Sequence, residues 1–194
     1  MTEAPATARQ NAEEAFLDAA ERLLVEIGYA AITTRRLARE AGANQGLVHY
    51  YFGSMENLLV RVLERFTERL IVRQRAMYAA DLPFLEKWRQ AMRYLDEDFA
   101  SGYQKVWYEL QAMAWNKPEL RERIAHVTVE WREVLAGAFE QGRREHAIEM
   151  PIEPLATLVA AFNQGLILER LSGIDSGHRE LLAWIDAWLE ERER

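Results

Sequence analysis

Apolar residues recur with helical spacing along almost the whole chain. In the first segment they stand three and four positions apart, as on one face of a helix: Ala12, Ala15, Phe16, Ala19, Ala20, Leu23, Leu24 and Ile27. Gly28 follows the last of them, where a helix-ending residue is expected. No stretch alternates apolar and polar residues over the length of a strand with turn signals at both ends. The pattern therefore predicts an all-α fold.

Short helices separated by glycine are expected in the next part of the chain. The spacing predicts helices over 35–41 and 45–52, then a long helix from 55 to about 75. A residue that can cap a helix precedes each of them, at Thr33-Thr34, Asn44 and Ser54. Later helices are predicted at about 83–100, at 103–115, from 118, from about 151 to 171, and from about 176.

The two short helices meet the physical requirements of a helix-turn-helix. Ala38 is small enough for a steep helix crossing, and Gly42 supplies the left-handed position of the turn. The inward residues Leu37, Ala41, Val48 and Phe52 can close a core against Phe16, Ala20 and Leu23 of the first helix. The outward side of the second short helix then carries Gln45, Gly46, His49 and Tyr50. Such a surface suits a DNA major groove, although spacing alone equally allows an ordinary helical corner with a solvated polar face.

Composition limits the class of protein and its compartment. The 194 residues contain no cysteine, which excludes disulfides, thiol catalysis and cysteine-ligated metals. The net charge is −7, yet residues 34–53 carry three arginines and one glutamate. The first residues show no signal-peptide pattern, and the longest run without charge, 154–168, is shorter than the ~20 residues of a membrane span. We therefore expect a soluble, cytoplasmic protein with no membrane partner.

The motifs between residues 28 and 59 resemble a known DNA-binding domain. The sequence ITTRRLAREAGANQGLVHYYFGSMENLL, residues 32–59, is similar to the N-terminal domain of the tetracycline-repressor (TetR) family, and the likeness runs without a gap over about residues 12–62. The resemblance implies an all-α homodimer of about nine helices. Such proteins bind a palindromic double-stranded DNA operator through the helix-turn-helix and usually release it when a small molecule enters the C-terminal domain.

Carried over residue by residue, the resemblance implies a set of DNA contacts. Thr34 would bind a phosphate, Arg35 a base or a phosphate, and the start of the second short helix would meet base edges. The implied contact residues are Thr34, Arg35, Asn44, Gln45, Gly46, Leu47, His49, Tyr50 and Tyr51. Two positions depart from the family pattern. His49 stands where tyrosine is usual, and Met55 stands where a lysine usually neutralises a phosphate.

The remaining chain is expected to bind an effector and to dimerise. We expect a flexible start at residues 1–10, a DNA-binding domain at 11–60, and an effector-binding and dimerisation domain at 61–194. All six tryptophans lie beyond residue 87. Plain core packing accounts for most such residues, whereas a pocket with indole walls would suit a flat or hydrophobic effector. The pocket residues implied are Trp88, Met92, Trp107, Gln111 and Trp131.

The last two predicted helices are apolar on more than one side. One stripe of the first contains Leu155, Val159, Phe162 and Leu166, and a second contains Leu158, Ala161, Gly165 and Leu168. A helix with two apolar sides must bury both, and a four-helix interface between two protomers does so. The predicted interface residues are Leu155, Leu158, Val159, Phe162, Leu166, Leu181, Trp184, Ile185 and Trp188.

Catalytic and cofactor motifs are not visible in the sequence. The four histidines form no HExxH pair, the serines lie at helix boundaries, and no glycine run is suited to hold a phosphate. A trio at Glu145, His146 and Glu149 is interpreted as a solvated surface rather than a chelate. We predict a ligand-responsive regulator without a cofactor or metal. The alternatives are a helical dimer with weakened DNA binding and an all-α enzyme working in a tryptophan-rich cavity.

Overall fold

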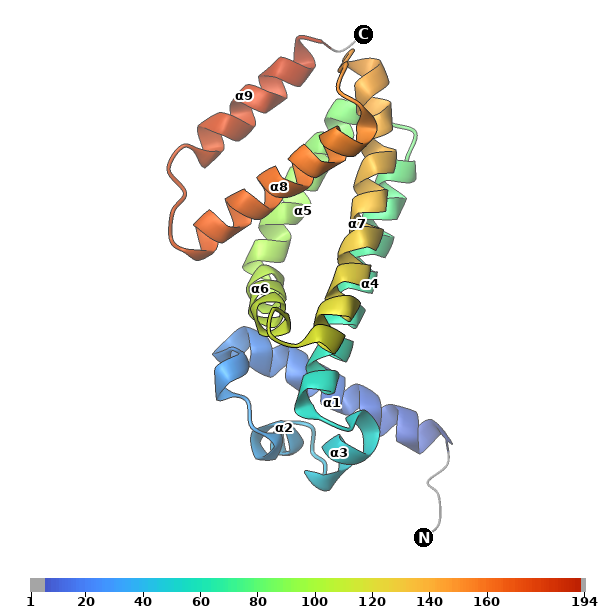
Figure 1. The fold of residues 1–194 in the computed structure, drawn as a ribbon, viewed down its shortest axis with the longest axis vertical. Coiled ribbons are helices and arrows are strands. Elements are labelled where there is room, and N and C mark those ends of the chain that lie inside the picture. The colour runs from blue at the N-terminus through green and yellow to red at the C-terminus, as the bar shows by residue number, and fades with distance from the viewer. Residues whose placement is uncertain (1–5, 193–194) are drawn as a thin grey trace. The chain divides into compact units, whose positions relative to one another are not determined.

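The chain is helical throughout the part that the computed structural model describes, residues 6–192. That part forms nine α-helices, one short 3-10 helix (η1) and no strand (Figure 1). In chain order they are α1 (Ala6–Ile27), η1 (Tyr29–Ala31), α2 (Thr34–Glu40), α3 (Gly46–Phe52), α4 (Met55–Ala79), α5 (Phe84–Ala100), α6 (Tyr103–Ala114), α7 (Pro118–Glu145), α8 (Ile152–Leu171) and α9 (His178–Glu190). The predicted all-α fold is confirmed. Within the same residues no helix has the length and the apolar run needed to cross a bilayer.

Local capping bonds explain where the short helices begin. The Thr33 hydroxyl accepts from the backbone N–H of Arg36 at 3.2 Å, ahead of α2. The Asn44 side-chain oxygen accepts from Gly46 N–H at 2.9 Å, and α3 begins at Gly46, one residue later than the spacing predicts. The Ser54 hydroxyl accepts from Asn57 N–H at 3.1 Å at the start of α4. These bonds satisfy N–H groups that have no partner inside the helix.

Two predicted helix ends differ from the observed ones. Helix α4 continues to Ala79, beyond the expected end near residue 75, because Ala76, Met77, Tyr78 and Ala79 contain no helix breaker and Met77 is buried. Helix α9 begins at His178 rather than near 176, because Gly177 precedes it with a φ of +84°. A backbone with that φ does not continue an α-helix.

The chain packs as two compact units. The first contains the residues up to Glu68 together with Ser101–Ala125, and the second contains Arg69–Ala100 and the residues from His126 onward. Packing thus groups α6 and the start of α7 with α1–α3, whereas the sequence predicted a boundary near residue 60. Of the predicted flexible start, residues 1–5 lie outside the described residues and residues 6–10 form the first turns of α1. The functional division at 11–60 and 61–194 stays a prediction.

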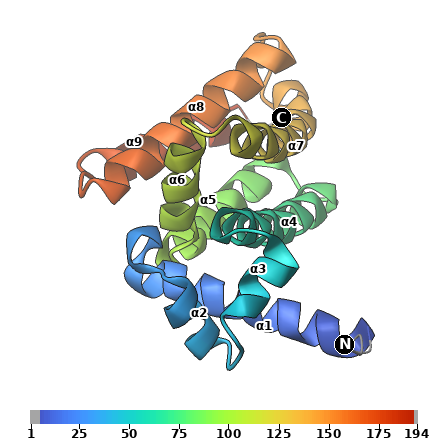
Figure 2. The same ribbon diagram turned by 60° about the horizontal axis from the view of Figure 1, so that its bottom comes forward.

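The core of the first unit brings together the residues expected for a helix-turn-helix. Phe16 and Leu37 are fully buried, and Val48 and Phe52 of α3 lie against them. The rings of Phe16 and Phe52 meet edge to face, with centroids 6.2 Å apart. In Figures 1 and 2, α2 and α3 lie beside α1. Helices α6 and α7 add buried side chains to the same core, namely Val106, Leu110, Ala114, Leu120 and Ile124.

The second unit has its own aromatic core. Phe84 and Phe139 meet edge to face at 5.0 Å, and Trp88 is buried beside them. Arg89 of α5 donates two hydrogen bonds to Asp186 of α9, at 2.9 and 2.7 Å. This paired contact fixes the register of α9 against α5 within the unit, because an Arg–carboxylate pair with two bonds is geometrically specific.

Candidate nucleic-acid interface

Helix α3 has one buried side and one exposed side. Val48 and Phe52 face the core of the first unit, whereas Gln45, Gly46, His49 and Tyr50 are exposed. The turn before α3 contains Gly42 with a φ of +63°, which favours glycine because it has no Cβ. Leu37 and Ala38 of α2 are buried on the inner side of that turn. The polar side of α3 is therefore held outward by packing on its opposite side.

The predicted DNA-contact residues differ in their exposure. Thr34, Arg35 and Asn44 are exposed, as are the four outward residues of α3 named above. Leu47 and Tyr51 are half-buried and pack against the core of the first unit. The Tyr51 ring lies 6.3 Å from Phe16 and 5.1 Å from Tyr50, centroid to centroid. Tyr51 thus has a packing role that the sequence did not indicate.

Asn44 is already engaged by the start of α3. Its side-chain oxygen accepts from Gly46 N–H and lies 3.4 Å from the place where a Cβ at Gly46 would stand. The side-chain amide nitrogen of Asn44 is then the group left to donate to a base. Gly46 is exposed, so its small size leaves room for a close approach at this end of α3.

Three arginines give this part of the molecule a local positive charge. Within residues 6–192, the side chains of Arg35, Arg36 and Arg39 are exposed and form no ion pair. The neighbouring carboxylate of Glu40 is bound by Arg22 of α1, with 3.1 Å between Nε and Oε1. Glu40 therefore does not neutralise the three arginines of α2, although the whole chain is acidic. The sequence did not reveal this contact, because Arg22 and Glu40 are 18 positions apart.

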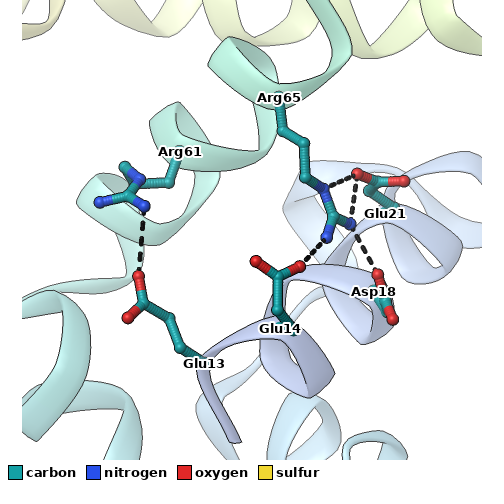
Figure 3. Close-up of polar contacts among 6 residues, drawn as sticks. All are labelled: Glu13, Glu14, Asp18, Glu21, Arg61 and Arg65. Carbon is teal, nitrogen blue, oxygen red and sulfur yellow. Dashed lines mark hydrogen bonds and ion pairs between the residues drawn. The ribbon is translucent and has the colours of Figure 1, made fainter. Parts of the chain in front are cut away.

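A cluster of ion pairs joins α1 to α4. The guanidinium of Arg65 contacts Glu14 at 2.8 Å and Asp18 at 2.9 Å, and it also binds Glu21 (Figure 3). Burial disfavours the charged guanidinium, but the hydrogen bond and charge of Glu21, followed by those of Asp18, raise the pKa of Arg65. The cluster holds α4 against the helix that supports the helix-turn-helix. Sequence reasoning missed it; the only signal was the helical spacing of acids at 14, 18 and 21.

A lysine from elsewhere in the chain stands at the start of α4. Met55 is half-buried against the core, so no cation comes from that position. The ammonium of Lys117, just before α7, lies 2.8 Å from the carboxylate of Glu56 in the first turn of α4. The hydrogen bond with Lys117 lowers the pKa of Glu56, and the same bond raises the pKa of Lys117. The start of α4 is thus neutralised by a residue 61 positions away.

Comparison with known proteins also indicates a helix-turn-helix in this part of the chain. Residues 16–62 match the family described as "Bacterial regulatory proteins, tetR family". YfiR of Bacillus subtilis, an HTH-type transcriptional regulator, is 25% identical over 169 residues, which are 80% of this chain and 78% of YfiR. The chain is thus similar to DNA-binding transcriptional regulators of the TetR family. The match covers the helix-turn-helix and the start of α4.

Solved structures share the fold of this chain. A putative transcriptional regulator from Rhodococcus sp. RHA1 superposes with a TM-score of 0.76, at 21% identity over 92% of this chain and 95% of that one. FadR from Bacillus subtilis, solved in complex with stearoyl-CoA, gives a TM-score of 0.72, at 18% identity over 91% and 95% of the two chains. At these identities the likeness establishes the fold.

The predicted pocket residues fall into both units. Trp88, Met92 and Trp131 belong to the aromatic core of the second unit, where Trp88 is buried and the other two are half-buried. Trp107 packs on the core of the first unit, and Gln111 is half-buried there. The pocket that these five residues would form stays a prediction.

A cavity of about 760 Å³ lies within the second unit, at the beginning of α9. Leu95 and Asp96 of α5, Leu166 and Arg170 of α8, and His178 and Leu182 of α9 line it. Arg170 pairs with Asp96 at 2.7 Å, so much of the wall is charged. None of the five predicted pocket residues lines this cavity.

Helix α8 is apolar on two sides, and the structure shows that one is buried and the other exposed. Leu155 and Leu166 are 6% and 7% exposed, so they belong to the chain's own core rather than to a surface for a partner. Val159 and Phe162 are half-buried on that same side. The opposite side, with Leu158, Ala161, Gly165 and Leu168, is exposed. We therefore remove Leu155 and Leu166 from the interface that the sequence predicts.

Helix α9 likewise has one apolar side that is exposed and one that packs against the core. Leu181 and Trp184 are exposed, with 62% of Trp184 accessible. Ile185 and Trp188 are half-buried and pack against the core of the second unit. Exposed apolar residues thus remain on both α8 and α9. Two long apolar surfaces without a cover are typical of an interface.

Glu145, His146 and Glu149 differ in their burial, and only Glu149 is exposed. His146 is 1% exposed, and its ring packs edge-on against Phe84 with centroids 5.7 Å apart. Glu145 accepts from the backbone N–H of Phe84 at 2.6 Å. The expectation of a solvated trio is therefore wrong for His146, because the end of α7 is covered by the start of α5. Among the residues that the structure describes, no three His, Asp or Glu side chains gather as metal ligands.

Proposed function

We propose that this chain is a repressor of the TetR family that binds a palindromic operator as a homodimer and leaves it when a small hydrophobic or aromatic effector binds. The observation that carries the proposal is the two-sided α3. Val48 and Phe52 anchor it, and Gln45, His49 and Tyr50 project from its exposed side. A short helix held in this way is suited to the major groove, where base edges differ in their donors and acceptors.

The DNA-binding part of the proposal assigns two kinds of contact. Thr34 and Arg36 at the start of α2 would bind phosphates, and Arg35 would bind a phosphate or a base. Gln45 and the amide of Asn44 would donate to or accept from base edges, while Leu47 offers a methyl contact to thymine. The three arginines support this assignment, since within residues 6–192 none is neutralised by an ion pair.

Selection of duplexes from a random pool tests this part directly. We expect the wild-type chain to enrich a palindrome whose half-sites lie about one helical turn, ~34 Å, apart. In fluorescence anisotropy the logarithm of the affinity should fall linearly with the logarithm of salt, by about 0.9 for each phosphate contacted. A pool that shows no enrichment, together with a binding constant that does not respond to salt, contradicts the DNA-binding assignment.

The homodimer part rests on the exposed sides of α8 and α9. Leu158, Ala161, Gly165 and Leu168 form one stripe, and at Gly165 no atom lies within 4 Å of the place where a Cβ would stand. A second α8 can therefore approach closely at this point, as a four-helix interface requires. Sedimentation should give twice the chain mass at micromolar concentration. A monomer at that concentration overturns this part.

The effector part rests on the aromatic core of the second unit. Trp88, Met92 and Trp131 lie there, and half-buried aromatic and thioether side chains are suitable walls for an apolar ligand. FadR, which shares the fold, was solved with stearoyl-CoA. Mass spectrometry of small molecules released by denaturing the purified chain should identify a hydrophobic or aromatic compound. That compound should lower the affinity for the selected duplex, and a compound without this effect is not the effector.

Repression is tested in cells with a reporter. A promoter that carries the selected duplex should be less active when the chain is expressed, and its activity should return when the identified compound is added. Higher activity on expression of the chain contradicts the repressor role while leaving DNA binding intact.

A further inference from the structure

The connection between α1 and α2 contains a backbone donor without a local acceptor. Helix α1 ends at Ile27, and Gly28 follows with a φ of +73° before the 3-10 helix η1. Because Gly28 is the N-cap residue of η1 and has no side chain, it offers no acceptor to the first N–H of η1, which belongs to Tyr29. The acceptor comes from α6 instead: Glu109 Oε2 receives this N–H at 2.8 Å.

The surroundings of Glu109 fix its carboxylate in this place. A Cβ at Gly28 would stand 2.9 Å from Glu109 Oε1, so only glycine admits both the positive φ and the carboxylate. Lys105, one turn earlier on α6, lies 4.0 Å from Oε1 on the same carboxylate. The carboxylate is thus held between a backbone donor and a cation. A hydrogen bond to a charged acceptor is about twice as strong as a neutral one.

The bond lies at the start of the segment that places α2. Ile32 N–H donates to the carbonyl of Tyr29 at 3.1 Å, which closes η1. Thr33 follows immediately and caps α2. Helix α2 in turn buries Leu37 and Ala38 beneath the turn that leads to α3. A change in the orientation of η1 therefore changes the position of α2, and with it the position of the exposed side of α3.

We infer that Glu109 is a positioning residue for DNA recognition: it holds the 28–32 turn so that α2 and α3 present their contacts in one arrangement. The inference rests on the proposed DNA-binding function and deepens it. Glu109 itself stands on α6, outside the helix-turn-helix, and its bond joins α6 to η1, the short helix that precedes α2. Replacing it removes a hydrogen bond and leaves Tyr29 N–H without a partner.

Two variants and a control isolate the hydrogen bond. Glu109→Ala removes the acceptor, whereas Glu109→Gln keeps an acceptor oxygen and removes the charge. Glu122→Ala is the matched control, because Glu122 is an exposed glutamate of the same unit that forms no hydrogen bond or ion pair within residues 6–192. Hydrogen–deuterium exchange of the peptide that contains Tyr29, and anisotropy with the selected duplex and a scrambled one, are measured on each full-length variant.

For Glu109→Ala we expect the 28–32 amides to exchange about tenfold faster and the affinity for the selected duplex to fall about tenfold, as a lost charged hydrogen bond implies. Binding to the scrambled duplex should change less, and Glu109→Gln should show smaller losses of about threefold in both measurements, because its neutral oxygen accepts a hydrogen bond about half as strong. If the exchange rates of the 28–32 amides and the affinity for the selected duplex are the same in Glu109→Ala as in the Glu122→Ala control, the inference is overturned. Equal losses in Glu109→Gln and Glu109→Ala, or equal losses on both duplexes, overturn it as well.

The result remains decisive if an alanine at 109 unfolds the chain. Glu109→Gln, which keeps the acceptor oxygen and removes only the charge, is then compared with Glu122→Ala: accelerated exchange confined to the 28–32 turn supports the inference, whereas unchanged exchange there overturns it. Failure of the proposed function is a different result: the wild-type chain then selects no duplex, while the exchange experiment on Tyr29 still decides whether Glu109 holds the turn.

Discussion

Replacing Arg65 with alanine removes the cation that three carboxylates of α1 share. The Arg65 side chain is 19% exposed and that of Glu21 is 18% exposed, whereas Glu14 and Asp18 are more than half exposed. The contact with Glu21 is thus close to a buried pair, and the other two are surface pairs. Arg61, one turn earlier on α4, is 52% exposed and binds Glu13 at 3.2 Å, so Arg61→Ala is a matched control.

The expected cost follows from this difference in burial. Breaking a fully buried pair costs about 3–5 kcal/mol, and an exposed pair contributes about 0–1 kcal/mol. We assign about 2 kcal/mol to the loss of the Glu21 contact and a few tenths to each of the exposed contacts. Arg65→Ala should therefore lower the free energy of unfolding by about 2–3 kcal/mol, and Arg61→Ala by less than about 1 kcal/mol.

Urea unfolding at one fixed protein concentration measures both variants. At about 0.5 M salt the small effect of Arg61→Ala should vanish, because surface charges are screened, while most of the Arg65→Ala effect persists. Losses for the two variants that agree within about 0.5 kcal/mol would show that burial of the Arg65–Glu21 pair does not strengthen it.

Three further outcomes are expected. Phe52→Ala should cost about 3–5 kcal/mol and abolish binding to the selected duplex, because it empties the core beneath α3; an unchanged melting temperature contradicts this. Trp184→Asp should sediment as a monomer, as should Leu158→Asp, since both place a charge on the exposed apolar sides of α9 and α8; a dimer of unchanged affinity contradicts the interface. The lowered pKa of Glu56 means that its ionised form stabilises the folded chain above pH 4.5, and this stability is lost as the pH falls through the lower folded-state value. Lys117→Met should therefore flatten the fall of the melting temperature below about pH 4.5, and an unaltered pH profile argues against the contact.

The features predictable from the sequence are those set by near neighbours. The caps at Thr33, Asn44 and Ser54 act over two or three residues, so the local sequence specifies the helix starts. The two sides of α3 follow from helical spacing, because Val48 and Phe52 are one turn apart and apolar while the residues between them are mostly polar. Fold class and the exposed reading side were predicted from these patterns.

The features that could not be predicted depend on contacts between distant residues. Both stripes of α8 are equally apolar, and nothing in the pattern indicates that Leu155 meets the chain's own core while Leu158 stays exposed. Tyr29 and Glu109 are 80 positions apart, and their bond depends on where α6 packs. The grouping of 101–125 with the helix-turn-helix has the same cause, since α6 has apolar residues typical of any amphipathic helix.

The exposed side of α3 is proposed to distinguish one DNA sequence from another, and the Gln45→Ala variant measures this discrimination. Its affinity is compared with that of the wild-type chain on the selected duplex and on a scrambled one, by anisotropy at a fixed salt concentration. A base contact predicts a loss of about 1–3 kcal/mol on the selected duplex with little change on the scrambled one. Equal losses on both duplexes, or no loss on either, would show that Gln45 does not distinguish bases and that α3 does not read the sequence through this residue.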